Sequence, residues 1–419
     1  YGYNTTGGIN LNNSAFGFGG FNGSTVGDVN LYSGTLGLLY SNGNTGINNT
    51  QGQHFSNQVI KIGAEATNGV TLNVNGPGLV NVNVGNVSSN TQWGVGNILQ
   101  VGDLNMSNTT LTLSGGNSYR LRAAGTTTIK GSQAAFQTNS DGPGGALELF
   151  GLVTGSGAIT KLGDGTMRGI VLANPGNNYS GGTNIVAGDV QVTATTGSAL
   201  GSGAIRVFPD GTLRIAANSS IDGSKLTVMS RINALGAVSI DNEFNPTVLN
   251  STNFSSVYNT TLQLGATHFN QALNLATIGD GRAFLGSGLG AEVKYLAPTL
   301  GAGVADAWNP TAGVYRLLGG VSNLSFEGVD NVLTGDNFLQ LGPQRNMVLG
   351  AVVNSGNGVL IRNSNNYTGG TQITEGTILY IETGGAPGGQ TPLGTGAVEI
   401  YGQLRVQQSQ GSLWNANTS

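Results

Sequence analysis

The stretch "NNYSGGTNIVAGDVQV", residues 177–192, returns further along the chain as "NNYTGGTQITEGTILY", residues 365–380. Eight of the sixteen aligned positions are identical. Neither copy contains a plausible nucleophile, a metal ligand or a phosphate-binding sequence, so the repetition points to a structural element. The similarity continues downstream, because "GSALGSGAIRVFPDGTLRI" at 197–215 parallels "QTPLGTGAVEIYGQLRV" at 390–406. A chain that repeats whole phrases in the same order is built from repeated structural units.

The composition around these copies is typical of an all-β protein. Of the 419 residues, 72 are Gly and only 9% are charged, while 38% are hydrophobic. The hydrophobic share is large enough to form a core, and the excess of Gly, Asn, Ser and Thr suits short strands joined by tight turns. Apolar residues recur at alternate positions, as at Val80, Val82 and Val84, which places them on one face of a strand. Residues 266–277 are the one stretch predicted to form a short helix.

Many short strands can form a sandwich, a propeller or a solenoid, and internal repetition favours the solenoid. An insertion around residues 384–389 interrupts the second copy, as is typical of loops that project from a regular stack. We therefore predict successive coils that pair through their backbones about 4.8 Å apart and share a central apolar column. With coils of about twenty residues, the chain would form on the order of fifteen to twenty turns.

The charge pattern and the residue counts argue against several classes of function. The formal net charge is -4 and the 16 basic residues are scattered, so neither nucleic acid nor an anionic membrane is expected as a partner. The absence of Cys excludes disulfides, thiol catalysis and Cys-ligated metals. No apolar run predicts a transmembrane segment, and no motif predicts a cofactor or a metal. The two histidines, His54 and His268, lack a nearby acid or nucleophile phrase and are predicted to be structural or surface residues.

Residues 155–207 carry four phrases in a fixed order: Gly-Ser-Gly, Lys-x-Gly-x-Gly-Thr, Tyr-Ser-Gly-Gly-Thr and Ala-Leu-Gly-Ser-Gly-Ala. This series resembles the autotransporter-associated β-strand repeat of bacterial passenger domains. Residues 355–406 resemble it as well, with "GNGVLIRNSNNYTGGT" in place of the Lys-x-Gly-x-Gly-Thr phrase. "GVYRLLGG" (313–320) and "LTGDNFLQLG" (333–342) are similar to phrases found between such repeats. The resemblance implies a right-handed parallel β-helix that is exported across the outer membrane or displayed on a bacterial surface in an equivalent way.

The domain organisation follows from the composition and the resemblance together. Residues 1–56 are rich in Gly, Asn and aromatic residues and are predicted as an N-terminal cap or an inter-subunit segment. Residues 57–419 are predicted as the β-helix with loop insertions, with repeats at about 155–217 and 355–407. No segment after Trp414 predicts the strands of a membrane β-barrel, so the sequence leaves the anchoring route open.

In a stack of coils, the repeated phrase is interpreted as a corner. Gly is needed where a Cβ would clash or strain a positive φ, and Tyr would pack over the bend with its hydroxyl reaching water or a backbone group. Within the strand that follows the first copy, Ile185 and Ala187 would point into the column. The predicted structural corner residues are Tyr179, Gly181, Gly182, Gly188, Tyr367, Gly369, Gly370 and Gly376.

Two acidic pairs and three tryptophans are the candidates for a functional site. A glycosidase needs two carboxyl groups about 5–10 Å apart, which Asp241 with Glu243, on one strand face, or Asp280 with Glu292 would supply. We favour solvated surface positions for all four, since no pocket is indicated. Trp93, Trp308 and Trp414 either pack corners or stack on a sugar or a partner chain, and packing is favoured. No catalytic, cofactor-binding or metal-binding residue is predicted.

These observations favour a non-enzymatic extracellular β-solenoid with a structural or adhesive role. We expect it to self-associate as a homo-oligomer or filament, in fibres or a surface layer, and to contact surface glycans or other cells. The first alternative is a secreted β-helix that binds or cleaves polysaccharide. A toxin-like autotransporter passenger is a further alternative that rests on the family resemblance alone.

Overall fold

The structure is a computed structural model of the chain. It describes residues 9–11, 14–19, 28–40, 59–61, 69–75, 80–86, 97–115, 118–138, 146–163, 169–216, 221–231, 234–254, 260–305, 310–342, 357–383, 391–408 and 413–416. The chain divides into two compact units. The first comprises Tyr1–Arg206, Asp210–Leu213 and Ser219–Ile221, and the second comprises Val207–Pro209, Arg214–Asn218 and Asp222–Ser419. Strand β17 (Ile205–Ile215) contains residues of both units.

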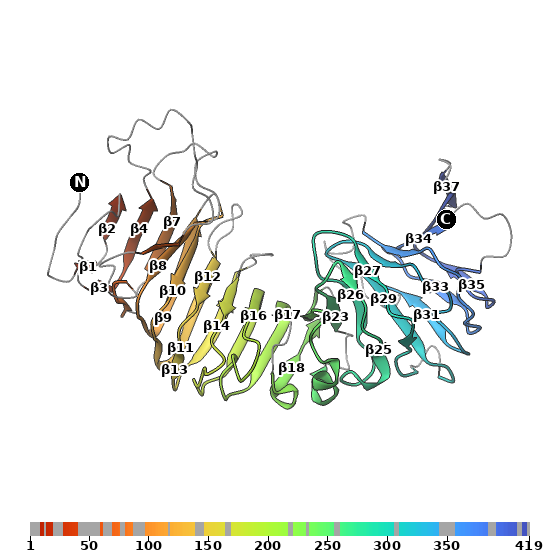
Figure 1. Ribbon diagram of the computed structural model, residues 1–419, viewed down its shortest axis with the longest axis horizontal. Helices are drawn as coiled ribbons and strands as arrows, with labels where there is room; N and C mark the ends of the chain where they lie inside the picture. The colour runs from red at the N-terminus through yellow and green to blue at the C-terminus, as the bar shows by residue number, and fades with distance from the viewer. Residues whose placement is uncertain are drawn as a thin grey trace. The chain divides into compact units, whose positions relative to one another are not determined.

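The first unit is a stack of coils with three strands in each turn (Figure 1). The first strand position is occupied by β1 (Ile9–Leu11), β3 (Val29–Leu31), β6 (Leu72–Val74), the starts of β9 (Leu104–Gly115) and β11 (Thr127–Thr138), and β13 (Val153–Gly155). The second is occupied by β2 (Ser14–Gly19), β4 (Gly34–Tyr40), β7 (Val80–Asn86), the ends of β9 and β11, β14 (Ala158–Leu162) and the start of β16 (Thr183–Val192). The third is occupied by β5 (Val59–Lys61), β8 (Ile98–Val101), β10 (Arg120–Ala123), β12 (Ala146–Leu149), β15 (Ile170–Leu172) and the end of β16.

The second unit is also built from parallel ladders of strands. One ladder runs through β21 (Ala237–Ile240), β23 (Thr261–Leu264), β26 (Phe284–Ser287), β29 (Val314–Gly320), β31 (Phe338–Leu341), β33 (Thr371–Ile373) and β35 (Val398–Ile400). A second runs through β24 (His268–Phe269), β27 (Val293–Tyr295), β30 (Leu324–Phe326), β32 (Val359–Ile361), β34 (Ile378–Thr383) and β36 (Gln403–Gln408). Shorter pairs join β18 (Leu226–Val228) to β22 (Asn253–Phe254) and β25 (Leu273–Asn274) to β28 (Leu300–Gly301).

All of these pairings are parallel, which confirms the predicted all-β parallel β-helix. Two antiparallel pairings occur among the described strands, between β19 (Ser230–Arg231) and β20 (Ala234–Leu235) and between β36 and β37 (Leu413–Ala416). Three short 3₁₀ helices, η1 (Gly223–Lys225), η2 (Pro246–Ser251) and η3 (Leu275–Thr277), lie between strands of the second unit.

The core of each unit is a column of side chains. Alternate residues of the strands point inward to form it. In the first unit Val29, Leu72 and Leu104 pair in register on successive coils and are fully buried. Burying each such side chain stabilises the fold by about 1.5–3 kcal/mol. In the second unit the column includes an aromatic stack, in which the ring centroids of Phe269 and Tyr295 lie 6.1 Å apart and those of Tyr295 and Phe326 lie 5.4 Å apart. The alternating apolar pattern therefore specifies the inner face.

The coils are longer and more variable than the predicted twenty residues. Asn10, Asn30, Asn73 and Asn105 form a ladder of side-chain amide hydrogen bonds on the outer face, with donor–acceptor distances of 2.7–2.8 Å. Successive members of this asparagine ladder are separated by 20, 43 and 32 residues. The predicted coil length was wrong because loops of different length leave the stack between strands, which a solenoid tolerates without moving its neighbours.

Two further expectations concern particular segments. The helix predicted at 266–277 was wrong, because His268 and Phe269 pair with β27 and only Leu275–Thr277 turns, capped by the Asn274 side chain. Within residues 1–56, predicted as a cap or inter-subunit segment, β1 to β4 continue the parallel ladders and pair onward with β6 and β7.

Candidate functional site

The first copy of the repeated phrase forms a corner that bonds three successive coils. The buried Asn177 side chain accepts from Val153 N at 2.8 Å and donates from Nδ2 to Ala199 O at 2.7 Å. Val153 begins the strand of the coil before, and Ala199 belongs to the coil after. One amide therefore satisfies a donor and an acceptor on two different neighbours, both of which would otherwise be buried without a partner.

The second copy reproduces the same contacts in the other unit. The buried Asn365 side chain accepts from Leu333 N at 3.1 Å and donates from Nδ2 to Pro392 O at 3.1 Å. Leu333 begins the phrase Leu-Thr-Gly, just as Val153 begins Val-Thr-Gly. Pro392 begins Pro-Leu-Gly-Thr-Gly, which matches Ala-Leu-Gly-Ser-Gly at Ala199. The repeated phrase is thus one part of a three-coil unit whose other two parts also repeat.

A buried Tyr–Thr hydrogen bond holds the bend inside each copy. The hydroxyl of Tyr179 lies 2.6 Å from Thr183 Oγ1, and that of Tyr367 lies 2.6 Å from Thr371 Oγ1. Both tyrosines are fully buried, and burial raises the pKa of each phenol far above its ordinary value, although the Thr hydrogen bond opposes this. The tyrosine hydroxyls were expected to reach water or a backbone group. Instead, each one hydrogen-bonds the threonine hydroxyl four residues later in the same phrase.

Two different constraints require glycine at these positions of the phrase. Gly182 and Gly370 have φ of 89° and 100°, and Gly188 and Gly376 have φ of 72° and 77°, in the region that favours glycine. Close approach by the preceding coil constrains the other two. A Cβ on Gly181 would lie 2.3 Å from Ala158 N, and one on Gly369 would lie 2.5 Å from Asn337 O.

Sequence reasoning missed the asparagines and threonines of the corner. Asn177, Thr183, Asn365 and Thr371 are identical between the two copies, and this identity was the available signal. The asparagines bond residues of other coils, and each threonine bonds a buried tyrosine, so the spacing within the phrase does not reveal either contact. In the following strand, Ile185 is buried as expected, whereas Ala187 is only half-buried.

Replacing Tyr179 by phenylalanine is expected to lower the free energy of unfolding by about 1 kcal/mol, because it removes one buried hydrogen bond while retaining the ring. Tyr367→Phe should have the same effect, since the second corner has the same geometry. Urea denaturation followed by circular dichroism measures the change. The control is Tyr32→Phe at an exposed position. An unchanged stability in both corner variants would show that the Tyr–Thr bond does not hold the bend.

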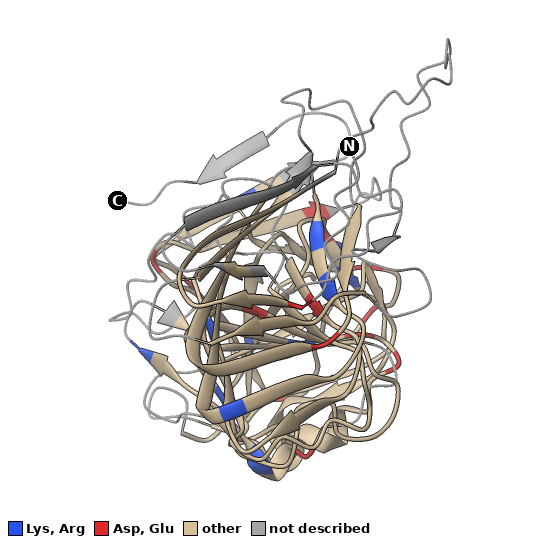
Figure 2. Ribbon diagram, turned by 90° about the vertical axis from the view of Figure 1, so that its left-hand side faces the viewer, with Lys and Arg blue, Asp and Glu red and all other residues tan. Residues whose placement is uncertain are grey.

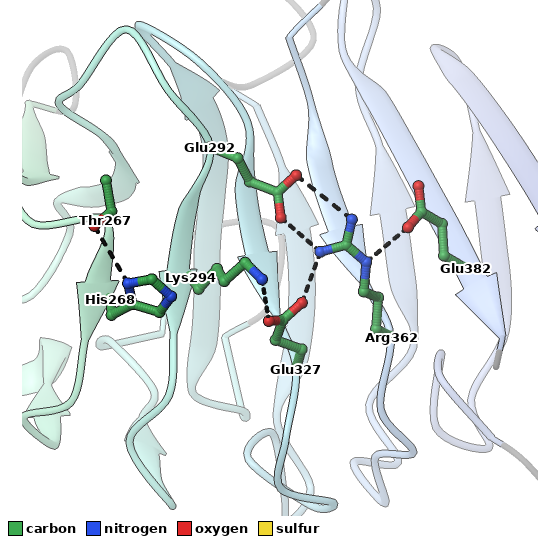
Figure 3. Close-up of polar contacts among 7 residues, drawn as sticks. All are labelled: Thr267, His268, Glu292, Lys294, Glu327, Arg362 and Glu382. Atoms are coloured by element: carbon green, nitrogen blue, oxygen red, sulfur yellow. Dashed lines mark hydrogen bonds and ion pairs between the residues drawn. The ribbon is translucent and has the colours of Figure 1, made fainter.

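A charged cluster on the outer face of the second unit cross-links four coils (Figure 3). Its centre is Arg362, directly after β32, whose Nη1 lies 2.5 Å from Glu292 Oε1 and 2.7 Å from Glu327 Oε2. Arg362 Nε lies 2.6 Å from Glu382 Oε2, in β34. Lys294, in β27, completes the charged cluster with Nζ 2.6 Å from Glu327 Oε1. Glu292 and Arg362 are 70 residues apart in the sequence, so only stacking brings them together.

The electrostatics of the charged cluster favour the ionised state of its glutamates. Burial by itself raises the pKa of Glu292, but hydrogen bonds and the charge of Arg362 outweigh it, so the pKa is lowered. For Glu327, burial is again opposed by Lys294 and Arg362, and the pKa is lowered. Burial acts to lower the pKa of Arg362, but its three carboxylate partners hold it above the ordinary value. With three glutamates against one arginine and one lysine, the ionised charged cluster carries one net negative charge.

The structure places the candidate acidic residues in turns and in the charged cluster. Asp241 and Glu243 do not share a strand face, because β21 ends at Ile240 and the chain turns, with Phe244 N donating to Asp241 O. Burial raises the pKa of Asp241, which Arg214 partly opposes. Asp280 accepts from Arg282 N in the turn before β26, whereas Glu292 belongs to the charged cluster.

The remaining candidates lie mostly outside the described residues. His54, Trp93 and Trp308 lie outside the described residues. Trp414 lies in β37 and is paired in register with Val406 of β36. His268 is exposed on β24, with Nδ1 3.3 Å from Thr267 Oγ1 (Figure 3).

Charged residues are sparse along the described strands and turns (Figure 2). Over the ranges that the structure describes, no group of three or more His, Asp or Glu side chains is arranged to hold a metal ion. In the same part of the chain, no helix has the length and hydropathy needed to cross a membrane. Comparison with protein-family models, curated proteins and solved structures gives no match for this chain.

Proposed function

We propose that this protein is a non-enzymatic structural or adhesive β-solenoid of a bacterial surface that self-associates into fibres or a layer. The observation that carries the proposal is the use of polar side chains to bond one coil to the next. The asparagine ladder, the corner asparagines and the charged cluster all make contacts of this kind. A stack reinforced in this way resists unravelling from either end, as an extended surface element requires.

The autotransporter-like assignment is part of this proposal. It is supported by the conserved order of three phrases on three consecutive coils, which recurs in both units with the same hydrogen bonds. Extracellular display is proposed from the resemblance to passenger-type repeats.

A role without catalysis is supported by the positions of the acidic side chains. The carboxylate of Glu292 receives two hydrogen bonds from Arg362, so it is committed to the charged cluster. Self-association is supported by the low charge of the outer faces, because a formal net charge of -4 spread over 419 residues opposes side-by-side contact only weakly.

Electron microscopy of the purified protein over a range of concentrations tests the proposal. We expect fibres or sheets at high concentration, and Asp241→Ala with Glu243→Ala should leave them unchanged. A strictly monomeric protein at all concentrations would contradict self-association. Release of reducing ends from a polysaccharide by the wild-type protein, lost in the double variant, would favour the polysaccharide-cleaving alternative.

A further inference from the structure

Phe150 lies on the outer face of the first unit and is unusually exposed for an aromatic residue. It follows β12 directly, and 53% of its surface is accessible, whereas the preceding Leu149 is fully buried in the column. Successive residues of a strand point to opposite faces, so the Phe150 ring stands outward. Backbone hydrogen bonds from Ala124 N to Val101 O, Phe150 N to Ala123 O and Ala173 N to Leu149 O continue the ladder through this row.

The neighbours of Phe150 in this row are small. Ala124 precedes it and Ala173 follows it on the adjacent coils, about 4.8 Å away on either side. The next corner position, Gly151, must remain without a side chain, because a Cβ there would lie 1.8 Å from Gly125 O. Because Ala124 and Ala173 are small, the aromatic ring of Phe150 projects beyond its neighbours in this row. One exposed apolar residue is common on protein surfaces, but this one is combined with a fixed group of charges.

One guanidinium group lies against the ring, and a second is joined to it through a shared carboxylate. Arg122 lies with its Cζ 4.8 Å from the centroid of the Phe150 ring, in a cation–π arrangement. Arg120 and Arg122 both bond Glu148, at 2.6 Å and 2.7 Å, and the Glu148 side chain is only 8% exposed. Within the described residues, these contacts pair two cations with one buried anion. The site thus carries one positive charge beside an exposed aromatic face.

We infer that Phe150, Arg122 and Arg120 form a binding site for an acidic polysaccharide. A sugar ring stacks on the face of Phe150, and a carboxylate of the same or the next sugar accepts hydrogen bonds from a guanidinium group. The small residues on either side let an extended chain continue across neighbouring coils. This inference deepens the adhesive part of the proposed function, on which it rests, by naming the class of ligand.

Isothermal titration calorimetry with a galacturonic acid hexamer tests the site. We expect binding to the full-length protein that weakens as salt is added, since the contact is partly electrostatic. Phe150→Ala should weaken binding at least fivefold, and Arg122→Lys, which retains the charge but not the planar group, should weaken it less. Tyr32→Ala, a similarly exposed aromatic in the same unit, is the matched control and should bind as the wild type does.

The inference would be overturned by no binding to the wild-type protein, by equal binding to Phe150→Ala, or by equal binding of a neutral hexasaccharide. Equal affinity for a glutamate hexamer would also overturn it, because the ring would then contribute nothing. Electron microscopy of Phe150→Ala distinguishes failure of the glycan site from failure of the proposed self-association. Fibres that form without the ligand affinity would remove the glycan site and leave self-association standing.

Discussion

Asn177→Ala is expected to lower the free energy of unfolding by about 3 kcal/mol. The substitution removes two buried hydrogen bonds and leaves Val153 N and Ala199 O without partners on two different coils. Each buried group left unsatisfied costs about 1–3 kcal/mol, and the small alanine side chain adds a cavity. Asn365→Ala should have a similar effect on the second unit, through Leu333 N and Pro392 O.

Chemical denaturation measures this loss, and hydrogen exchange locates it. In Asn177→Ala the Val153 amide should exchange much faster than in the wild type, because its acceptor has been removed. The exposed neighbours provide matched controls, since Asn178→Ala and Asn366→Ala change the same residue type one position away. If the buried and exposed variants lost equal stability, the asparagine bridge would have no role in joining the coils.

Arg362→Met is expected to lower the free energy of unfolding at neutral pH by about 2–3 kcal/mol. The substitution retains much of the volume but leaves Glu292, Glu327 and Glu382 without their common cation. Removing the shared cation of a half-buried cluster is costly because the remaining carboxylates stay partly desolvated, although solvent screening makes the loss smaller than for a fully buried pair. The control is Lys225→Met, which removes an exposed ion pair with Asp222 and should change stability little.

The pH dependence of stability distinguishes a charge effect from a packing effect. In the wild type the pKa values of Glu292 and Glu327 are lowered from 4.5, so their contribution is present above pH 4.5 and is lost as the pH falls through the lower folded-state values. In Arg362→Met the facing carboxylates repel, which raises their pKa values above those of the unfolded chain. As the pH is lowered from neutral to about pH 5, the free energy of unfolding of the variant should therefore rise relative to that of the wild type. A constant difference at every pH would assign the loss to packing.

The sequence by itself determined the fold class and the inner face of the helix. Alternation at Val80, Val82 and Val84 specifies which side chains enter the column, because side-chain direction in a strand depends only on local geometry. The glycines at positions 182 and 370 likewise follow from a local requirement, a positive φ at the bend. Repetition of the phrase made a stacked architecture the most economical interpretation.

Only the tertiary structure decided which residues of different coils lie together. Asn30 and Asn73 are 43 residues apart and Asn10 and Asn30 only 20, because loops of unequal length separate equivalent strands. The spacing along the chain therefore does not reveal that Asn177 bonds Ala199 or that Arg362 reaches Glu292. The same holds for Phe150, whose position beside Arg122 depends on the register of β10 and β12. Pairing between coils is set by backbone ladders and the shared column, which act across the stack, whereas sequence patterns report forces within one strand or turn.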